Sequence, residues 1–238
     1  MAATGRLADR IALVTGASRG IGAAVARRFA GEGAHVVATA RTVGGLEELD
    51  DRIRKAGGSA TLVPLDLADG AAIDRLGQAL FERFGRLDVL AACAGDLGTL
   101  TPVAHIKPPE WDRVLAINLS ANYRLIRGLD SLLRASASGR AIFVTSGVTE
   151  RAHAYWGSYA VSKAGLEMLA LLYAAETRQS QLRVNLVNPG AVRTAMRAKA
   201  YPGEDPNSLP APDDITEVFV ELAEAACTRH GDIVEARR

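Results

Sequence analysis

Tyr159 and Lys163 lie four residues apart in the stretch YWGSYAVSK, residues 155–163, at a spacing that suits proton transfer. A free tyrosine has a pKa of about 10, so at neutral pH it holds its proton too tightly to act as a base. A neighbouring cation favours the phenolate and lowers that pKa. Positions i and i+4 are neighbours on a helix, so Lys163 can serve Tyr159, whereas Tyr155 has no lysine at this spacing. The pair alone is equally compatible with an ordinary amphipathic helix.

A glycine-rich turn, TGASRGIG at residues 15–22, follows the first apolar segment of the chain. Its glycines permit a tight turn and a close approach of the backbone to a pyrophosphate. The helix that begins there supplies free N–H groups and the positive end of its dipole. Such a turn can also serve packing alone, but its place between a strand and a helix predicts dinucleotide binding. The predicted cofactor contacts here are Gly16, Ser18, Arg19, Gly20, Ile21 and Gly22.

The residues after the second predicted strand indicate which dinucleotide is bound. An acidic side chain there would bind the adenosine ribose 2′-hydroxyl and disfavour a 2′-phosphate. This chain has Ala40 followed by Arg41, and Arg19 lies in the neighbouring turn. Two guanidinium groups without a carboxylate suit a phosphate dianion, so we expect NADP(H) to be favoured over NAD(H). Alternatively, both are solvated residues in a chain with 24 arginines and four lysines.

Short apolar segments alternate with segments of helical periodicity along the whole chain. We expect strands at residues 11–15, 35–40, 60–65, 87–92, 140–145 and 182–187. Helices are expected at residues 19–32, 46–56, 71–84, 109–134, 159–177 and 213–228. This alternation predicts an α/β fold with a doubly wound, mostly parallel sheet (a Rossmann fold), forming a single domain over residues 1–238. The proline-rich stretch within residues 192–212 is expected to be a mobile, substrate-binding lid.

Composition excludes several classes of function. The chain of 238 residues has a formal net charge of +1, so no basic excess points to nucleic acid. No apolar run approaches the length of a membrane span, and the N-terminus has no apolar signal core. The two cysteines and four scattered histidines offer neither a disulfide framework nor a metal site. We therefore expect a reduced, cytoplasmic protein without a metal.

Together, the motifs resemble the short-chain dehydrogenase/reductase family, a family of NAD(P)-dependent oxidoreductases. Besides the glycine turn they are Asn118 in INL, Ser146 in VTSG, the pair in YAVSK, and NPG at residues 188–190. Ser146 precedes Tyr159 by 13 residues, as is usual in that family. The resemblance covers roughly residues 7–195, and the order of the motifs is far more specific than any one of them.

The resemblance implies a role for each matching residue. Tyr159 would be the general acid in carbonyl reduction and the base in the reverse reaction, while Ser146 would hydrogen-bond the substrate oxygen. Lys163 would hold the nicotinamide ribose and lower the pKa of Tyr159. Asn118 would anchor a water that links Lys163 to solvent. The further cofactor contacts would be Asp66 and Leu67 at the adenine, Ala94 and Gly95 beside the cofactor, Pro189 and Gly190 at the nicotinamide, and Thr194 at its carboxamide.

Two departures from the family pattern stand out. Ala92 and Cys93 replace two asparagines that commonly brace the strand ends, so we expect less rigidity there but unchanged chemistry. Cys93 is expected to be a small buried residue. The C-terminal sequence HGDIVEARR lacks the usual Gly-Gly signal, so the last strand is expected to be short or absent.

The expected function is the NADP(H)-dependent interconversion of a small-molecule carbonyl compound and an alcohol by hydride transfer. A ketone, an aldehyde or a 3-oxoacyl group could be the substrate, and Arg193, Arg197 and Lys199 could meet an acidic carrier or simply be solvated. The alternative is a non-catalytic NADP(H)-binding sensor or scaffold. A homodimer or homotetramer is expected, formed through helices 109–134 and 159–177. Their apolar stripe (Leu166, Leu169, Leu172, Tyr173) could equally be buried within one chain.

Overall fold

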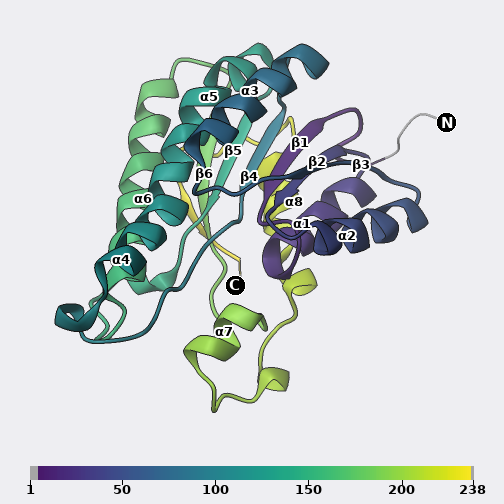
Figure 1. Cartoon of the computed structure of the whole chain (residues 1–238). Helices are drawn as coiled ribbons and strands as arrows, with labels where there is room; N and C mark the ends of the chain where they lie inside the picture. Colours follow the sequence, from purple (N-terminus) through teal and green to yellow (C-terminus); the bar gives the residue numbers. More distant parts are fainter. Residues whose placement is uncertain (1–4, 237–238) are drawn as a thin grey trace.

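A seven-stranded, entirely parallel sheet forms the centre of the molecule (Figure 1), in a computed structural model that describes residues 5–236. The strand order is β3-β2-β1-β4-β5-β6-β7. The predicted doubly wound α/β fold in a single domain is thus confirmed. The strands are β1 (Ile11–Thr15), β2 (His35–Ala40), β3 (Ser59–Pro64), β4 (Val89–Ala92), β5 (Arg140–Val144), β6 (Arg183–Asn188) and β7 (Ile233–Glu235). The last strand is present but has only three residues, which pair with β6.

Helices cover both faces of the sheet, which explains why the central strands are continuous apolar runs. One face packs against α1 (Gly20–Gly31), α2 (Val43–Lys55) and α8 (Glu217–Ala223), with Phe29 and Phe219 in its core. The other face packs against α3 (Gly70–Phe84), α5 (Ala121–Ala135) and α6 (Gly157–Thr177), with Phe143 and Leu129 in its core. Every residue of β1, β4 and β5 is buried between these layers.

The helix predicted at residues 109–134 is interrupted by a π-helical turn. It consists of α4 (Pro108–Leu115), the π turn Ala116–Ser120, and α5. The Asn118 side chain donates to the Asp96 carbonyl at 2.8 Å and to Ser162 Oγ at 2.9 Å. The Asn122 side chain donates to the Asn118 carbonyl at 2.8 Å. Because π turns are frequent at functional sites, this turn makes Asn118 a candidate functional residue.

The helix predicted at residues 213–228 is also shorter than expected. A 3₁₀ turn, Pro212–Ile215, precedes α8, which ends at Ala223. Beyond that point the Arg140 guanidinium binds the backbone: it donates hydrogen bonds to the carbonyls of Glu224 at 2.9 Å and Ala225 at 2.6 Å. These carbonyls therefore face a side chain from β5 instead of continuing the helix.

The segment 192–212 is not irregular throughout. It contains α7 (Ala195–Ala200) and a 3₁₀ turn, Pro206–Ser208, and it projects from the body of the molecule (Figure 1). Its two ends meet, because the Arg193 N–H donates to the Pro210 carbonyl at 2.9 Å.

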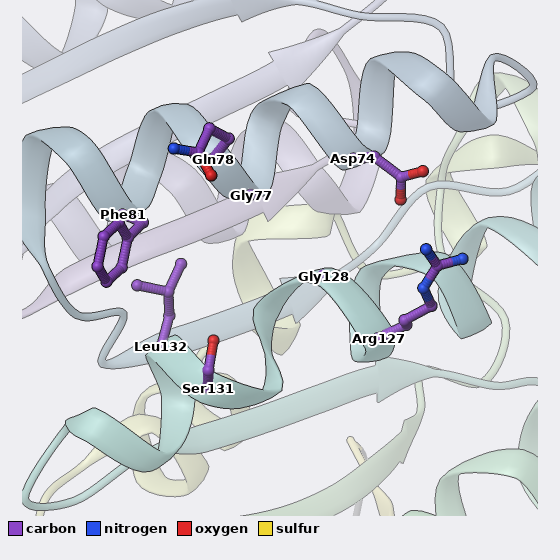
Figure 2. Close-up of a pocket in the computed structure, with 8 residues that line it drawn as sticks. All are labelled: Asp74, Gly77, Gln78, Phe81, Arg127, Gly128, Ser131 and Leu132. Carbon is purple, nitrogen blue, oxygen red and sulfur yellow. The ribbon is translucent and has the colours of Figure 1, made fainter.

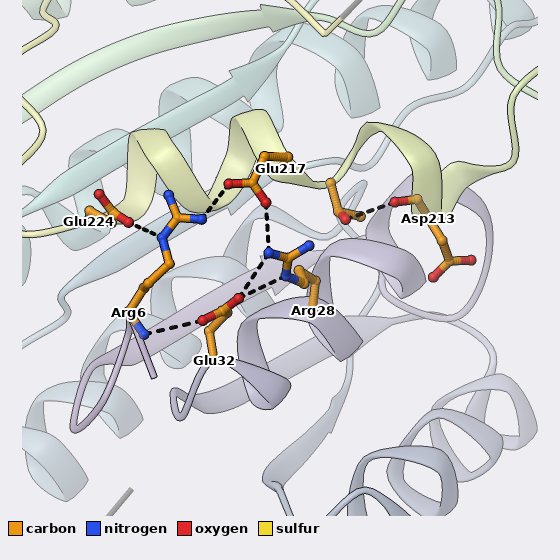
Figure 3. Close-up of polar contacts among 7 residues, drawn as sticks. Arg6, Arg28, Glu32, Asp213, Glu217 and Glu224 are labelled. Carbon is orange, nitrogen blue, oxygen red and sulfur yellow. Dashed lines mark hydrogen bonds and ion pairs between the residues drawn. The ribbon is translucent and has the colours of Figure 1, made fainter. Parts of the chain in front are cut away.

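A cluster of ion pairs joins the N-terminal segment, the end of α1 and helix α8 (Figure 3). Arg6 binds Glu217 and Glu224. Arg28 binds Glu217 at 2.7 Å and Glu32 at 2.9 Å. The charged groups are partly exposed, so each pair contributes little to stability, and the cluster mainly fixes where α8 lies. Within residues 5–236, no helix combines the length and the apolarity needed to cross a bilayer.

Candidate active site

The predicted site residues gather at one edge of the sheet. The glycine turn follows β1, Ala94 and Gly95 follow β4, Ser146 follows β5, and Pro189 follows β6. Because all strands are parallel, these positions share the carboxyl-terminal edge. The order of the strands reverses between β1 and β4, and doubly wound proteins bind ligands at such a switch point.

The glycine turn is packed so closely that side chains at two positions would collide with backbone. Gly16 has φ of +67°, and a Cβ added there would lie 2.8 Å from Ala94 Cα. A Cβ at Gly22 would lie 2.4 Å from the Gly16 carbonyl oxygen. The Thr15 hydroxyl accepts a hydrogen bond from the Ala94 N–H at 3.2 Å, which joins the turn to the loop after β4. The turn therefore has the tight geometry that a close approach of backbone to a phosphate requires.

Two arginines border this turn without taking part in an ion pair of residues 5–236. Arg19 and Arg41 are both exposed. The Ala17 N–H donates to the Thr39 carbonyl at 3.1 Å, which places the turn beside the end of β2, just before Arg41. Ser18 packs against the start of α2, where a Cβ at Gly45 would lie 2.8 Å from Ser18 Cβ. Ile21 is half-buried against the core. This surface has the charge needed for a phosphate.

Tyr159 and Lys163 lie side by side on α6 and are almost fully buried. Their exposed fractions are 7% and 3%, whereas Tyr155 is 59% exposed. The Lys163 ammonium lies 5.9 Å from the centroid of the Tyr159 ring and donates to the Val144 carbonyl at 2.8 Å. Burial lowers the pKa of Lys163 to about 8, although Cys93 and Glu167 act in the opposite direction. An ammonium with this pKa can gain or lose a proton near neutral pH.

The pKa of Tyr159 is raised, whereas the sequence predicted that it would be lowered. Burial raises it, and a hydrogen bond with the Ser146 side chain acts in the opposite direction. The loss of water around the phenol outweighs its polar neighbours, because the phenolate is the form that burial penalises. Tyr159 is thus held in its protonated form at neutral pH, as a proton donor must be.

Asn118 braces the loop after β4 with its own side chain. Its Oδ1 accepts from the Asp96 N–H at 2.7 Å, and its Nδ2 donates to the Asp96 carbonyl at 2.8 Å. This reciprocal pair supports the loop that follows Ala92 and Cys93, the two positions at which the family pattern commonly has asparagines. Burial raises the pKa of the Cys93 thiol to about 12, so this cysteine is neutral and unreactive at physiological pH.

The remaining predicted cofactor residues lie around the same edge. Asp66 is exposed and accepts from the Ala68 N–H at 3.0 Å, and Leu67 beside it is half-buried. Gly190 has φ of +66°. Thr194 caps α7 by accepting from the Arg197 N–H at 3.1 Å, and its methyl group would lie 3.6 Å from a Cβ added at Gly20. Segment 192–212 thus reaches the glycine turn.

Two neighbours of this site, Tyr201 and Glu167, were not predicted from the sequence. Tyr201 packs against Trp156 with ring centroids 5.8 Å apart, and Trp156 in turn meets the Tyr159 ring edge-on at 5.9 Å. Glu167, the other missed residue, lies one helical turn beyond Lys163. The i+4 spacing to Lys163 could have identified it, whereas no local signal marks Tyr201.

The cations of segment 192–212 are engaged within the chain. Arg197 binds Glu204 through two hydrogen bonds of 2.6 Å and stacks on Tyr201 at 3.8 Å. Lys199 donates to the Gly98 carbonyl at 2.7 Å. Arg193 is exposed. Arg197 thus holds the segment together internally, and Lys199 joins it to the loop after β4.

A separate surface pocket of about 470 Å³ lies between α3 and α5 (Figure 2). Gly77 and Gly128 allow these helices to approach closely there, since a Cβ at Gly77 would lie 2.8 Å from the Gly128 carbonyl oxygen. Asp74 and Arg127 lie at one end of the pocket and Phe81 at the other. It contains none of the residues predicted for the chemical site.

Comparison with known proteins gives consistent results. Residues 10–205 match the family model described as short chain dehydrogenase. The chain is 37% identical over 219 residues to YciK, an uncharacterized oxidoreductase of Escherichia coli K12, covering 91% of this chain and 86% of that protein. It is 33% identical over 187 residues to the 3-oxoacyl-[acyl-carrier-protein] reductase FabG of the same organism, covering 79% and 75%.

Solved structures agree in both fold and sequence. A short-chain dehydrogenase from Shigella flexneri 2a strain 301, complexed with NADP, superimposes with a TM-score of 0.92 at 36% identity and covers 99% of each chain. A protein of the same description from Pseudomonas syringae gives 0.93 at 36%, covering 100% and 98%. The chain is therefore a member of the short-chain dehydrogenase family, an NAD(P)-dependent oxidoreductase, as its motifs predicted.

Proposed function

We propose that the protein interconverts a carbonyl compound and an alcohol, with Tyr159 as the proton donor and acceptor. The observation that carries this proposal is the buried phenol of Tyr159, which lies beside the Lys163 ammonium at the carboxyl-terminal edge of the sheet and whose pKa the Ser146 side chain lowers against the effect of burial. When bound, the nicotinamide cofactor supplies or accepts the hydride.

The side chains have complementary tasks in carbonyl reduction. Ser146 orients the carbonyl oxygen, and Tyr159 gives that oxygen a proton as negative charge develops on it. In the reverse reaction Tyr159 must accept the proton. The neighbouring ammonium of Lys163 then stabilises the phenolate. The same ammonium is a compact hydrogen-bond donor, which suits the hydroxyl groups of a ribose. Asn118 holds the loop after β4 in place.

Replacing Tyr159 by phenylalanine tests this assignment, because the change removes one oxygen atom and leaves the ring packing intact. We expect turnover of NADPH with a panel of ketones and aldehydes to fall by a factor of at least about 10², while the NADPH dissociation constant changes little. The matched control is Tyr155→Phe, at the exposed tyrosine, which should behave like the native protein. Retained turnover in Tyr159→Phe would refute the role. Tight NADPH binding by the native protein without turnover of any carbonyl would favour the sensor or scaffold instead.

The cofactor is proposed to be NADP(H). Its support is the exposed guanidinium pair of Arg19 and Arg41, and the descriptions of two similar structures as complexes with NADP and NADPH. Replacing Arg41 by alanine should raise the Michaelis constant for NADPH about tenfold, as expected for one lost charge-assisted contact to phosphate, and leave that for NADH unchanged. Arg52→Ala, at an exposed arginine of α2, is the control. A native enzyme that prefers NADH, or uses both equally, would contradict the proposal.

Segment 192–212 is proposed to be the lid over an uncharged carbonyl substrate. The phenol is surrounded by apolar side chains: Leu97, Leu100, Val148, Trp156 and Met196. Arg197 and Lys199 already have partners within the chain, so they are poorly placed to receive an acidic carrier. Neutral ketones should therefore be turned over in preference to acetoacetyl-coenzyme A. A clear preference for the thioester would instead favour the 3-oxoacyl substrate that FabG is named for.

A homo-oligomer is proposed to form through α5 and α6. Leu166 and Tyr173 of the predicted stripe are buried in the chain's own core. Val161, Met168 and Leu172 instead form an exposed apolar row along α6. Light scattering of the purified protein decides between a monomer and an assembly through this row.

A further inference from the structure

Glu167 connects the two halves of the candidate site. It lies on α6 one turn beyond Lys163, so Tyr159, Lys163 and Glu167 succeed one another at intervals of four residues on one side of the helix. Its Oε1 accepts hydrogen bonds from the Thr145 hydroxyl at 2.5 Å and the Thr149 hydroxyl at 2.8 Å. These two threonines flank Ser146, which lies in the turn after β5.

We propose that Glu167 is a positioning residue of the active site: its carboxylate fastens the Ser146 turn to α6 and supplies the negative charge that keeps Lys163 protonated. The proposal deepens the proposed function, on which it rests for the roles of Ser146 and Lys163. Glu167 itself touches neither substrate nor cofactor in this scheme. It acts by fixing where the serine hydroxyl lies relative to the phenol.

The attachment runs through buried hydroxyl groups. Thr145 is 1% exposed, and its N–H is already bonded to the Val187 carbonyl at 2.9 Å, so the strand end itself is fixed. Its hydroxyl would lose its acceptor without Glu167, and an unsatisfied buried hydroxyl is unfavourable. Thr149 can turn to the Ser146 carbonyl, 2.9 Å away, and would then bond only within the turn. Loss of Glu167 therefore detaches the turn from the helix.

The charge of Lys163 depends on few neighbours. Cys93 faces it from the loop after β4, β5 contributes the neutral Val144 carbonyl, and α6 contributes Tyr159 and Glu167. The Cys93 thiol is neutral, because burial raises its pKa to about 12, and the pKa of Tyr159 is raised as well. Glu167 is thus the carboxylate that offsets the effect of burial on the pKa of Lys163, which is lowered to about 8.

Three substitutions separate charge from attachment. Glu167→Gln keeps an oxygen acceptor for both threonines and removes only the charge. Glu167→Ala removes both. Thr145→Val removes one hydrogen bond without changing the charge or the size of the side chain. Glu176→Gln, at an exposed residue of the same helix, is the matched control.

The protonation of Lys163 can be measured by NMR without a substrate. The chain has only four lysines, so their resonances can be told apart. In protein labelled with ¹³C at lysine Cε, each lysine gives one NMR resonance, and Lys163→Met assigns that of Lys163. Removing a negative neighbour lowers a lysine pKa, so the midpoint should move to lower pH by about one pH unit in Glu167→Gln. It should stay in place in Glu176→Gln. A midpoint in Glu167→Gln equal to that of the native protein overturns the role of the charge.

Hydrogen exchange followed by mass spectrometry measures the attachment in the full chain. Peptides that cover residues 145–149 should exchange about tenfold faster in Glu167→Ala and Thr145→Val, as expected when a hydrogen bond to a charged group is lost. Glu167→Gln should keep near-native protection. Unchanged exchange in a variant that carries both Thr145→Val and Thr149→Val, and so lacks both bonds to Glu167, overturns the attachment even if Glu167→Ala fails to fold. Neither readout requires turnover, so a failure of Tyr159→Phe to abolish activity would refute the proposed function and leave these results standing.

Discussion

Substitution of Gly16 by alanine is expected to damage both the stability of the fold and the binding of NADPH. Gly16 combines two constraints, a left-handed backbone conformation and a close approach to the backbone of another segment. Its φ of +67° is unfavourable for any residue with a Cβ, and that Cβ would lie 2.8 Å from Ala94 Cα, where ordinary contact begins at 3.4 Å. Since the obstacle is backbone, no side-chain rotation can relieve it.

The expected loss of stability in Gly16→Ala can be worked out by comparison with two other glycines. Gly57 has φ of +83° with no atom within 4 Å of an added Cβ, so Gly57→Ala should cost only the backbone strain, about 1–2 kcal/mol of unfolding free energy. Gly31, at the end of α1, has neither constraint, so Gly31→Ala should raise stability by up to about 1 kcal/mol. Gly16→Ala adds an overpacking cost of about 1–3 kcal/mol to the strain, for a total of roughly 2–5 kcal/mol.

Urea unfolding of the three variants measures these differences, and fluorescence titration with NADPH measures binding. Because the loop after β4 must shift to admit the new methyl group, NADPH should bind Gly16→Ala at least about tenfold more weakly, the effect of roughly 1.4 kcal/mol. Gly57→Ala should bind normally. If Gly16→Ala were no less stable than Gly57→Ala and bound NADPH as the native protein does, the inferred close packing of the turn would be wrong.

Two further expectations concern residues outside the turn. Arg140→Met should lower the free energy of unfolding in urea by about 3 kcal/mol or more, because it removes a buried guanidinium that donates to the partly buried carbonyls beyond α8; a loss below about 1 kcal/mol would show that water replaces the guanidinium. Arg197→Gln should change stability by less than about 1 kcal/mol but speed proteolysis within segment 192–212 several-fold, since its partly exposed ion pair with Glu204 holds the two parts of the segment together. Glu204→Gln should do the same, and the double variant should add nothing; additive effects would mean that the two residues act separately.

The sheet could be predicted from the sequence because its central strands are apolar on both faces. The interruptions of the helices could not. The π turn at Asn118 depends on Asp96 and Ser162, which are distant in the sequence, and one extra residue in a turn hardly disturbs apolar periodicity. Likewise, α8 ends where Arg140, from β5, takes up the following carbonyls.

The candidate site followed from motif order, but its electrostatics did not. The spacing of Tyr159 and Lys163 gives their proximity, whereas the raised pKa of Tyr159 depends on burial that only the packed structure reveals. Tyr201 escaped prediction because its contact with Trp156 depends on how segment 192–212 folds back.

The hydrogen bond between Arg193 and Pro210 has a practical consequence for crystallography. Because this bond joins the two ends of segment 192–212, the segment can move as one rigid unit. Gly190, whose added Cβ would meet no atom within 4 Å, lies just before the first of these ends. A crystal lattice that packs against segment 192–212 in its closed position would prevent the segment from moving, so soaked compounds could not enter the site beneath it. We therefore expect that complexes will have to be assembled in solution before crystals are grown.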